Sequence, residues 1–122
     1  MTLYYIKNGS ASELQEIIKK YDKSIIITDT NVYYLYQNAI DTLLPTCIYQ
    51  IPEGEPSKCF TLVKNVIDTM FLHNLDRNSC VIAIGGGVVG DFAGMVASVY
   101  LRGIHFIQVP TTLLSMVDSS TG

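Results

Sequence analysis

The chain has 122 residues, of which 48% are hydrophobic and 16% charged, and its net charge at pH 7 is −3. This length supports one domain with a genuine core, and the composition excludes a disordered chain. The absence of a basic surplus argues against nucleic acid or an anionic membrane as a partner.

No segment predicts a membrane span or a secretion signal. The longest apolar region, Phe92–Leu101, is too short to cross a bilayer, and residues 1–7 lack a basic region followed by a long apolar one. The three cysteines, Cys47, Cys59 and Cys80, are odd in number and show no metal-binding spacing. Buried, reduced thiols in a cytoplasmic protein are therefore expected.

Strands and helices are predicted to alternate along the whole chain. Short apolar runs rich in β-branched residues predict five strands, at residues 3–6, 24–28, 47–51, 80–84 and 105–110. Helical spacing predicts helices that start near Ser12, Val32, Ser57 and Phe92. This order predicts an α/β fold, a Rossmann-like doubly wound and mostly parallel sheet with helices on both faces.

Two of these helices carry apolar stripes that should face the core. The stripe of the second helix consists of Val32, Leu35, Tyr36, Ala39 and Ile40. The stripe of the third consists of Phe60, Val63, Ile67, Met70 and Phe71. Asn74 is the predicted end of that third helix.

A glycine-rich turn, Gly85-Gly86-Gly87-Val88-Val89-Gly90-Asp91, lies between the fourth strand and the helix expected at Phe92–Leu101. Gly85, Gly87 and Gly90 fit the spacing G-x-G-x-x-G. Without Cβ atoms such a turn can be tight and a phosphate can approach the backbone, while the helix start offers unpaired N–H groups. The turn therefore predicts pyrophosphate binding. A purely structural turn, with Asp91 as an acid of the first helical turn, is the alternative.

The ribose-binding acid of the Rossmann pattern is missing, because the next strand, residues 105–110, ends without a carboxylate. If a dinucleotide binds, residues from other strand ends must hold its ribose. Such polar residues gather at the edge where parallel strands end, and they are Asp29, Asn31, Glu53, Glu55, Asp91, Thr111 and Thr112. Lys58 could reach a hydroxyl group or a ring nitrogen. Each of the strand-end residues could instead be an ordinary helix cap or turn residue.

Three further charged or titratable residues have weaker signals. Arg102 stands beside Gly103 near the expected cleft, where it could bind a substrate anion or pair with a helix dipole. His73 and His105 have no partner at metal-ligand spacing, so we predict neither a catalytic residue nor a metal site.

Several motifs together resemble 3-dehydroquinate synthase. They are the glycine turn, Tyr100-Leu101-Arg102-Gly103, Gln108-Val109-Pro110-Thr111-Thr112-Leu113-Leu114, Val117-Asp118-Ser119-Ser120, and the upstream Pro52-Glu53-Gly54-Glu55-Pro56-Ser57-Lys58. The match runs from about Asp29 to the last residue. It implies cyclisation of 3-deoxy-D-arabino-heptulosonate 7-phosphate to 3-dehydroquinate with loss of phosphate, in the shikimate pathway that leads to aromatic amino acids. NAD would accept and then return a hydride, so that it is not consumed.

The resemblance also implies a set of site residues. Contacts with NAD are implied for Asp29, Thr30, Asn31, Glu55, Lys58, Gly86, Gly87, Val88, Val89, Gly90, Asp91, Thr111, Thr112, Leu114, Asp118 and Ser119. Arg102 and Asp118 would face the substrate. Glu53 is the weaker of the two glutamates, because the family motif fixes Glu55.

The chain departs from the family pattern after Gly122. The family continues with a glycine–lysine pair and a helical domain whose glutamate and two histidines bind a divalent metal, zinc or cobalt. We therefore expect residues 1–122 to be an N-terminal NAD-binding domain, truncated and inactive alone, of an enzyme that is a homodimer at full length.

Three other readings stay open. A related NAD-dependent polyol or glycerol-phosphate dehydrogenase would share the glycine turn, and a sister sugar-phosphate cyclase would share every motif present here. A non-catalytic nucleotide-binding module is the third possibility, with 122 residues as the whole functional unit.

Overall fold

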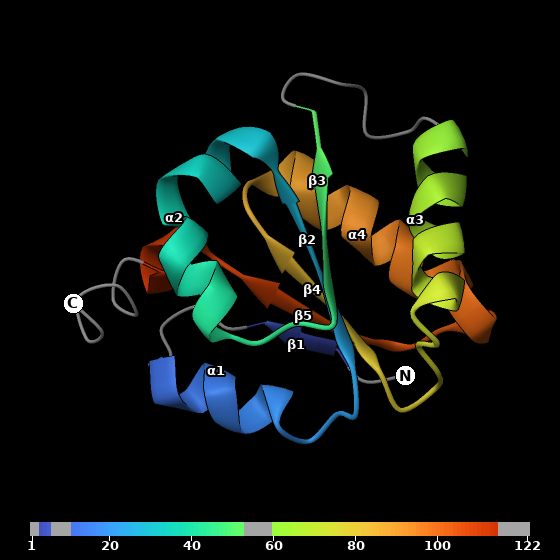
Figure 1. Cartoon of the computed structure of the whole chain (residues 1–122), viewed down its shortest axis with the longest axis horizontal. Helices are drawn as coiled ribbons and strands as arrows, with labels where there is room; N and C mark the ends of the chain where they lie inside the picture. Colours follow the sequence, from blue (N-terminus) through green and yellow to red (C-terminus); the bar gives the residue numbers. More distant parts are fainter. Residues whose placement is uncertain (1–2, 6–10, 53–59, 115–122) are drawn as a thin grey trace.

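The structure is a computed structural model that describes residues 3–5, 11–52 and 60–114, and in it five parallel strands form one sheet (Figure 1). The strands are β1 (Leu3–Tyr5), β2 (Ser24–Asp29), β3 (Cys47–Ile51), β4 (Cys80–Ile84) and β5 (His105–Val109), in the spatial order β1-β5-β4-β2-β3. The helices are α1 (Ala11–Ile18), α2 (Thr30–Thr42), α3 (Phe60–Leu72) and α4 (Gly87–Val99), followed by the 3-10 turn η1 (Tyr100–Arg102).

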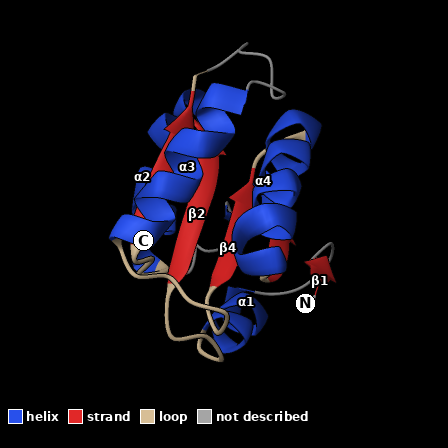
Figure 2. Cartoon of the chain, turned by 90° about the vertical axis from the view of Figure 1, so that its right-hand side faces the viewer, coloured by secondary structure: helices blue, strands red, loops and turns tan. Residues whose placement is uncertain are grey.

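The sheet is covered on both faces, which confirms the predicted doubly wound α/β fold. One hydrophobic cluster joins Ile25, Ile27 and Val81 to α3 and α4, and the other joins Ile26 and Ile82 to α1 and α2. Figures 1 and 2 show α2 and α3 on opposite sides of the sheet. Consecutive residues of β2 thus enter different cores, which explains why its sequence is continuously apolar instead of alternating.

The strand order reverses between β2 and β4. The chain runs outward from β2 to β3 and then returns to place β4 on the other side of β2. In the register of this pair, Thr28 lies opposite Ile84, so Asp29 lies next to the start of the glycine turn. Thr28 Oγ1 donates a hydrogen bond of 2.7 Å to the Ile84 carbonyl, and Thr28 is fully buried. Ligands of open α/β sheets bind beyond such a reversal.

Helix α4 begins five residues earlier than predicted, at Gly87 instead of Phe92. Glycine has a low intrinsic helix propensity, but here tertiary packing overrides it. Asp91 consequently lies beyond the first turn of α4, so the alternative in which it is a first-turn acid is wrong.

Both predicted apolar stripes need correction. In α2, Ala39 and Ile40 are buried and Val32 and Tyr36 pack against the core, but Leu35 is 59% exposed. The helix is kinked at Tyr36, which has non-helical dihedral angles (φ −124°, ψ 24°). In α3, the buried residues are Val63, Val66 and Met70. Phe60, by contrast, is 87% exposed and Phe71 is 53% exposed. Within residues 11–52 and 60–114, no helix has the length and hydropathy of a membrane span.

Candidate functional site

The glycine turn begins directly at the end of the buried strand β4. Gly85 has φ +152°, which favours glycine, and a Cβ atom at this position would lie 2.9 Å from Cγ2 of Val89. Cβ atoms at Gly86 and Gly87 would meet nothing within 4 Å. The first glycine is therefore required by the conformation of the turn, whereas the next two leave an open surface of bare backbone.

The N-terminus of α4 opens onto this surface. Gly86 is the N-cap residue and provides no side-chain hydrogen bond to the helix, and the first turn contains no acidic residue. The first intrahelical bond joins Gly90 N to Gly86 O, at 3.0 Å. The N–H groups of Gly87, Val88 and Val89 thus lack intrahelical acceptors and lie at the positive end of the helix dipole. This arrangement suits an anion.

A pocket of about 280 Å³ lies in front of this helix end. Its described lining consists of Gly85, Gly86, Gly87, Gln108, Val109 and Pro110, none of which is charged. The volume is near the lower limit of pockets that hold drug-sized ligands, roughly 300 Å³. The pocket therefore fits the diphosphate part of a dinucleotide better than the whole molecule.

Asp29 lies on the neighbouring strand end and caps α2. Its Oδ1 accepts a hydrogen bond of 2.7 Å from the Val32 N–H, which is the ordinary capping role that the sequence left open. The cap engages Oδ1 only. Oδ2 can therefore accept a hydrogen bond from a ligand, and a carboxylate at this edge suits a ribose hydroxyl better than a phosphate.

The structure brings together most of the described residues of the predicted cofactor set. Thr30 and Asn31 are exposed at the start of α2, and Val88 and Asp91 are exposed in the first turns of α4. Their side chains are accessible at the carboxyl edge of the sheet.

The other predicted contacts in this set differ in how they can reach a ligand. The side chains of Val89 and Leu114 are buried, so these residues could contact a cofactor only through their backbone. Thr111 is half-buried and Thr112 exposed, at the start of a helical stretch over residues 111–114. Gly90 is buried inside α4. The predicted contacts of Glu53, Glu55, Lys58, Asp118 and Ser119 lie outside the described residues.

Arg102 does not lie beside the glycine turn, contrary to the expectation from the sequence. It follows α4, whose 13 residues run from the turn at one edge of the sheet to the opposite edge. At about 1.5 Å per residue, this separates Arg102 from the turn by about 20 Å. Arg102 is exposed, and its φ of 67° follows a φ of 49° at Leu101. Within one copy of the chain, the two features do not form one site.

The described residues do not provide a metal site, since no three His, Cys, Asp or Glu side chains among them cluster. His73 Nδ1 lies 2.9 Å from the Thr69 carbonyl, and the His105 ring packs against Tyr21. Burial raises the pKa of the Cys47 thiol to about 11 and that of the Cys80 thiol to about 12. Both cysteines are free, and the protonated thiol dominates at neutral pH.

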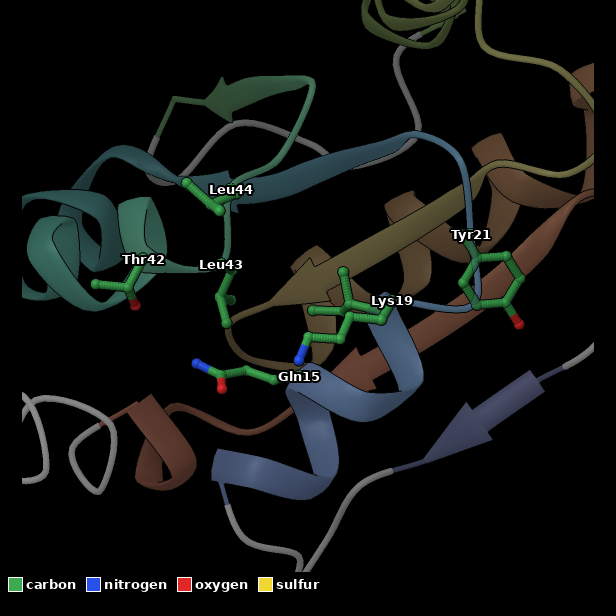
Figure 3. Close-up of a pocket in the computed structure, with 7 residues that line it drawn as sticks. Gln15, Lys19, Tyr21, Thr42, Leu43 and Leu44 are labelled. Atoms are coloured by element: carbon green, nitrogen blue, oxygen red, sulfur yellow. The ribbon is translucent and has the colours of Figure 1, made fainter.

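A second pocket, of about 340 Å³, lies at the opposite edge of the sheet (Figure 3). Its lining comes from the second half of α1, the end of α2 and the residues that follow each helix. It consists of Gln15, Ile18, Lys19, Tyr21, Thr42, Leu43 and Leu44. This lining is mostly apolar and includes no glycine turn. The pocket is larger than the one at α4, but it adjoins the C-terminal ends of α1 and α2, where the helix dipole disfavours an anion.

Two residues of the site were not singled out from the sequence. Thr28 connects the ends of β2 and β4, and Gln108 lines the pocket in front of α4. Each is a polar residue that directly follows an apolar run, Ile25–Ile27 in β2 and Phe106–Ile107 in β5, in a sheet that is covered on both faces. That contrast was the available signal, because a polar side chain in such a strand needs a partner.

Comparison with known families agrees with this geometry. Residues 48–122 match the family described as 3-dehydroquinate synthase N-terminal. The chain is 45% identical over 126 residues to the 3-dehydroquinate synthase of Thermoanaerobacter pseudethanolicus, with 97% of this chain and 35% of that protein covered. It is 50% identical over 105 residues to that of Desulforamulus reducens, with 82% and 29% covered. The chain thus spans about a third of the length of these relatives.

Solved structures share the fold. A 2-deoxy-scyllo-inosose synthase complexed with carbaglucose-6-phosphate, NAD+ and Co2+ superposes with a TM-score of 0.68 at 22% identity, over 88% of this chain and 31% of that one. A probable glycerol dehydrogenase from Sinorhizobium meliloti gives a TM-score of 0.54 at 16% identity, over 89% and 28%. The structural likeness extends to both classes of enzyme, whereas the sequence match distinguishes between them: this chain belongs to the 3-dehydroquinate synthase family.

Proposed function

We propose that this chain is the NAD-binding part of a 3-dehydroquinate synthase and that the glycine turn binds the pyrophosphate of NAD. The observation that carries the proposal is the open backbone surface at Gly86 and Gly87, at the N-terminus of α4 and beside Asp29. The bound NAD+ of the 2-deoxy-scyllo-inosose synthase, which has a similar fold, supports the same assignment.

The residues have separate roles in this proposal. The N–H groups of Gly87 and Val88 would donate to the diphosphate, and Gly86 would let it approach the backbone. Asp29 Oδ2 would accept a hydrogen bond from the adenosine ribose, with Thr30 and Asn31 beside it. When bound, NAD would supply a reversible hydride acceptor for a substrate hydroxyl.

The other predicted cofactor contacts stay predictions. They are Glu55, Lys58, Val89, Gly90, Asp91, Thr111, Thr112, Leu114, Asp118 and Ser119.

The proposals for the substrate and the metal depend on the part of the full-length relatives that this chain does not cover. We infer that the full-length protein acts on a heptulosonate phosphate and that Asp118 and Arg102 contribute to its binding. The described residues do not fit a divalent metal, so its ligands would come from a further domain of the kind that these longer relatives can hold. A cytoplasmic location and a homodimeric full-length protein also stay predictions.

NAD binding can be tested by calorimetric titration of this chain. We expect Gly87→Asp to weaken NAD binding at least about tenfold more than Gly87→Asn, since a carboxylate within a few ångströms of the diphosphate repels it by more than about 1 kcal/mol. Both side chains enter open space, and an acid at the first helical position does not destabilise α4. Equal affinities of the two variants, or no NAD binding by the unmodified chain, would contradict the proposal.

The activity can be tested with the product of the complete reading frame that contains this chain. We expect release of inorganic phosphate from the heptulosonate phosphate in the presence of NAD and a divalent metal, without net NADH. NADH that accumulates without phosphate release would instead indicate a dehydrogenase. The probable glycerol dehydrogenase with a similar fold is an enzyme of that class.

A further inference from the structure

We propose that Gln108 is a diphosphate-binding residue of the glycine-turn pocket, and that position 90 is a glycine because the Gln108 side chain occupies the space of its Cβ atom. This inference rests on the proposed function, since it assigns a further contact to the same ligand. Gly90 is the last glycine of the G-x-G-x-x-G spacing. In this inference it makes room for the Gln108 side chain, instead of letting a phosphate approach the backbone.

The fit between α4 and β5 supports the role of Gly90. A Cβ atom built at Gly90 would overlap Nε2 of Gln108 and would lie 3.2 Å from its Cδ. One turn later, a Cβ atom at Gly94 would lie 3.4 Å from Cε2 of Phe106. Gly90 and Gly94 therefore face the two residues of β5 that point toward α4, and the carboxamide of Gln108 lies against the bare backbone of the helix.

The position of Gln108 directs its carboxamide to the pocket. Phe106 belongs to the core under α3 and α4, and Ile107 belongs to the opposite core. Gln108, two residues after Phe106, faces α4 at the end of the strand, where it lines the pocket together with Gly85, Gly86 and Gly87.

The chemistry of this position favours a ligand contact. Gln108 is half-buried, and no hydrogen bond joins its carboxamide to another described residue. Because Gln108 lines the pocket, its carboxamide is within reach of a ligand that enters there. Beside it lie the free N–H groups of the first turn of α4, which are all donors. The carboxamide Nε2, which lies against Gly90, carries two N–H donors, and one that is turned to the pocket would join this set. The common partner of such donors is an anion, namely the diphosphate.

The first test uses Gln108→Leu, which keeps the shape of the side chain but removes its hydrogen bonds. We expect calorimetric titration to show affinities for NAD and ADP that are about tenfold lower, as for a lost hydrogen bond to a charged group, and an unchanged affinity for adenosine, which lacks the diphosphate. Gln37→Leu, on an exposed position of α2, is the matched control and should bind as the unmodified chain does.

The outcomes separate this inference from the proposed function. If the unmodified chain binds NAD and ADP and Gln108→Leu binds them equally well, the assignment of Gln108 is wrong, while the NAD site stands. If the unmodified chain binds neither, both proposals are wrong. A thermal melt without ligand checks that Gln108→Leu folds, and we expect its melting temperature to equal or exceed that of the unmodified chain.

The second test examines the pairing of the two residues with a double-mutant cycle. Gly90→Ala should weaken ADP binding when Gln108 is present, because the new methyl group displaces the carboxamide. In the Gln108→Ala background, Gly90→Ala should have no further effect, since the shorter side chain leaves room for the methyl group. Equal losses in both backgrounds would show that Gly90 has a role of its own and would overturn the pairing.

Discussion

At the scale of single residues, the site depends on two side chains that each contact another part of the protein and also face the space in which a ligand would bind. Asp29 uses Oδ1 to cap α2, and Oδ2 stays available. Gln108 lies against Gly90 and borders the pocket. Thr28 has a purely structural part, because its buried hydroxyl joins β2 to the last residue of β4, directly before the glycine turn.

Thr28→Val tests this connection. The substitution keeps the shape of the side chain but removes the donor to the Ile84 carbonyl, so we expect the free energy of unfolding to fall by about 1 kcal/mol. Urea denaturation followed by circular dichroism measures it. Thr69→Val is the matched control, because the Thr69 hydroxyl bonds the Asn65 carbonyl at an exposed position of α3, and we expect a change within about 0.5 kcal/mol. A loss at Thr28 no larger than at Thr69 would contradict the expectation.

At the scale of elements, helix ends were predicted with unequal success. Asn74 ends α3 as expected: its φ is 60°, its N–H bonds the Phe71 carbonyl, and the Leu75 N–H bonds the Met70 carbonyl. This pattern is a Schellman motif, whose left-handed residue is commonly glycine or asparagine. The start of α4 has no comparable sequence signal, because its N-cap, Gly86, has no side chain.

The left-handed position at Asn74 predicts opposite effects for two small replacements. Asn74→Gly should keep or raise the free energy of unfolding, whereas Asn74→Ala should lower it by about 1 kcal/mol, since alanine pays the steric cost of a positive φ. The midpoints of urea denaturation measure both changes. Asn78→Ala, at an exposed position of the next turn, serves as the control. A variant with alanine at position 74 that is more stable than the glycine variant would rule out the motif as the cause.

At the scale of the whole molecule, the arrangement that matters is a sheet buried on both faces. The α3–α4 core and the α1–α2 core lie on opposite sides of β2 and β4. The chain reverses its direction of winding between these two strands, and the pocket in front of α4 opens at the carboxyl edge beside them. The site is thus a product of the strand order and not of any one segment.

Two neighbouring residues of β2 test the burial of both faces. Ile26 and Ile27 are each fully buried but belong to different cores. We expect Ile26→Val and Ile27→Val each to lower the free energy of unfolding by about 1 kcal/mol, because each removes one buried methylene group. Leu72→Ala, at a position that is 79% exposed, should change it by less than about 0.5 kcal/mol. If either isoleucine variant matched Leu72→Ala, one face of the sheet would be open.

The sequence by itself determined the features that depend on neighbours along the chain. The alternation of strands and helices, the strand–turn–helix context of the glycines and the family motifs are all local patterns, and periodicity within about ten residues is enough to specify them. The end of α3 at Asn74 belongs to the same class, since a left-handed residue acts within one turn.

Only the tertiary structure decided which surfaces meet. Packing on the sheet selected Val63, Val66 and Met70 as the buried stripe of α3, and it allowed α4 to begin at Gly87. The placement of Gln108 against Gly90, and of Arg102 at the edge opposite the glycine turn, also required the fold. The physical reason is that these contacts join segments distant in sequence, and strand order, which no local pattern encodes, determines their distances.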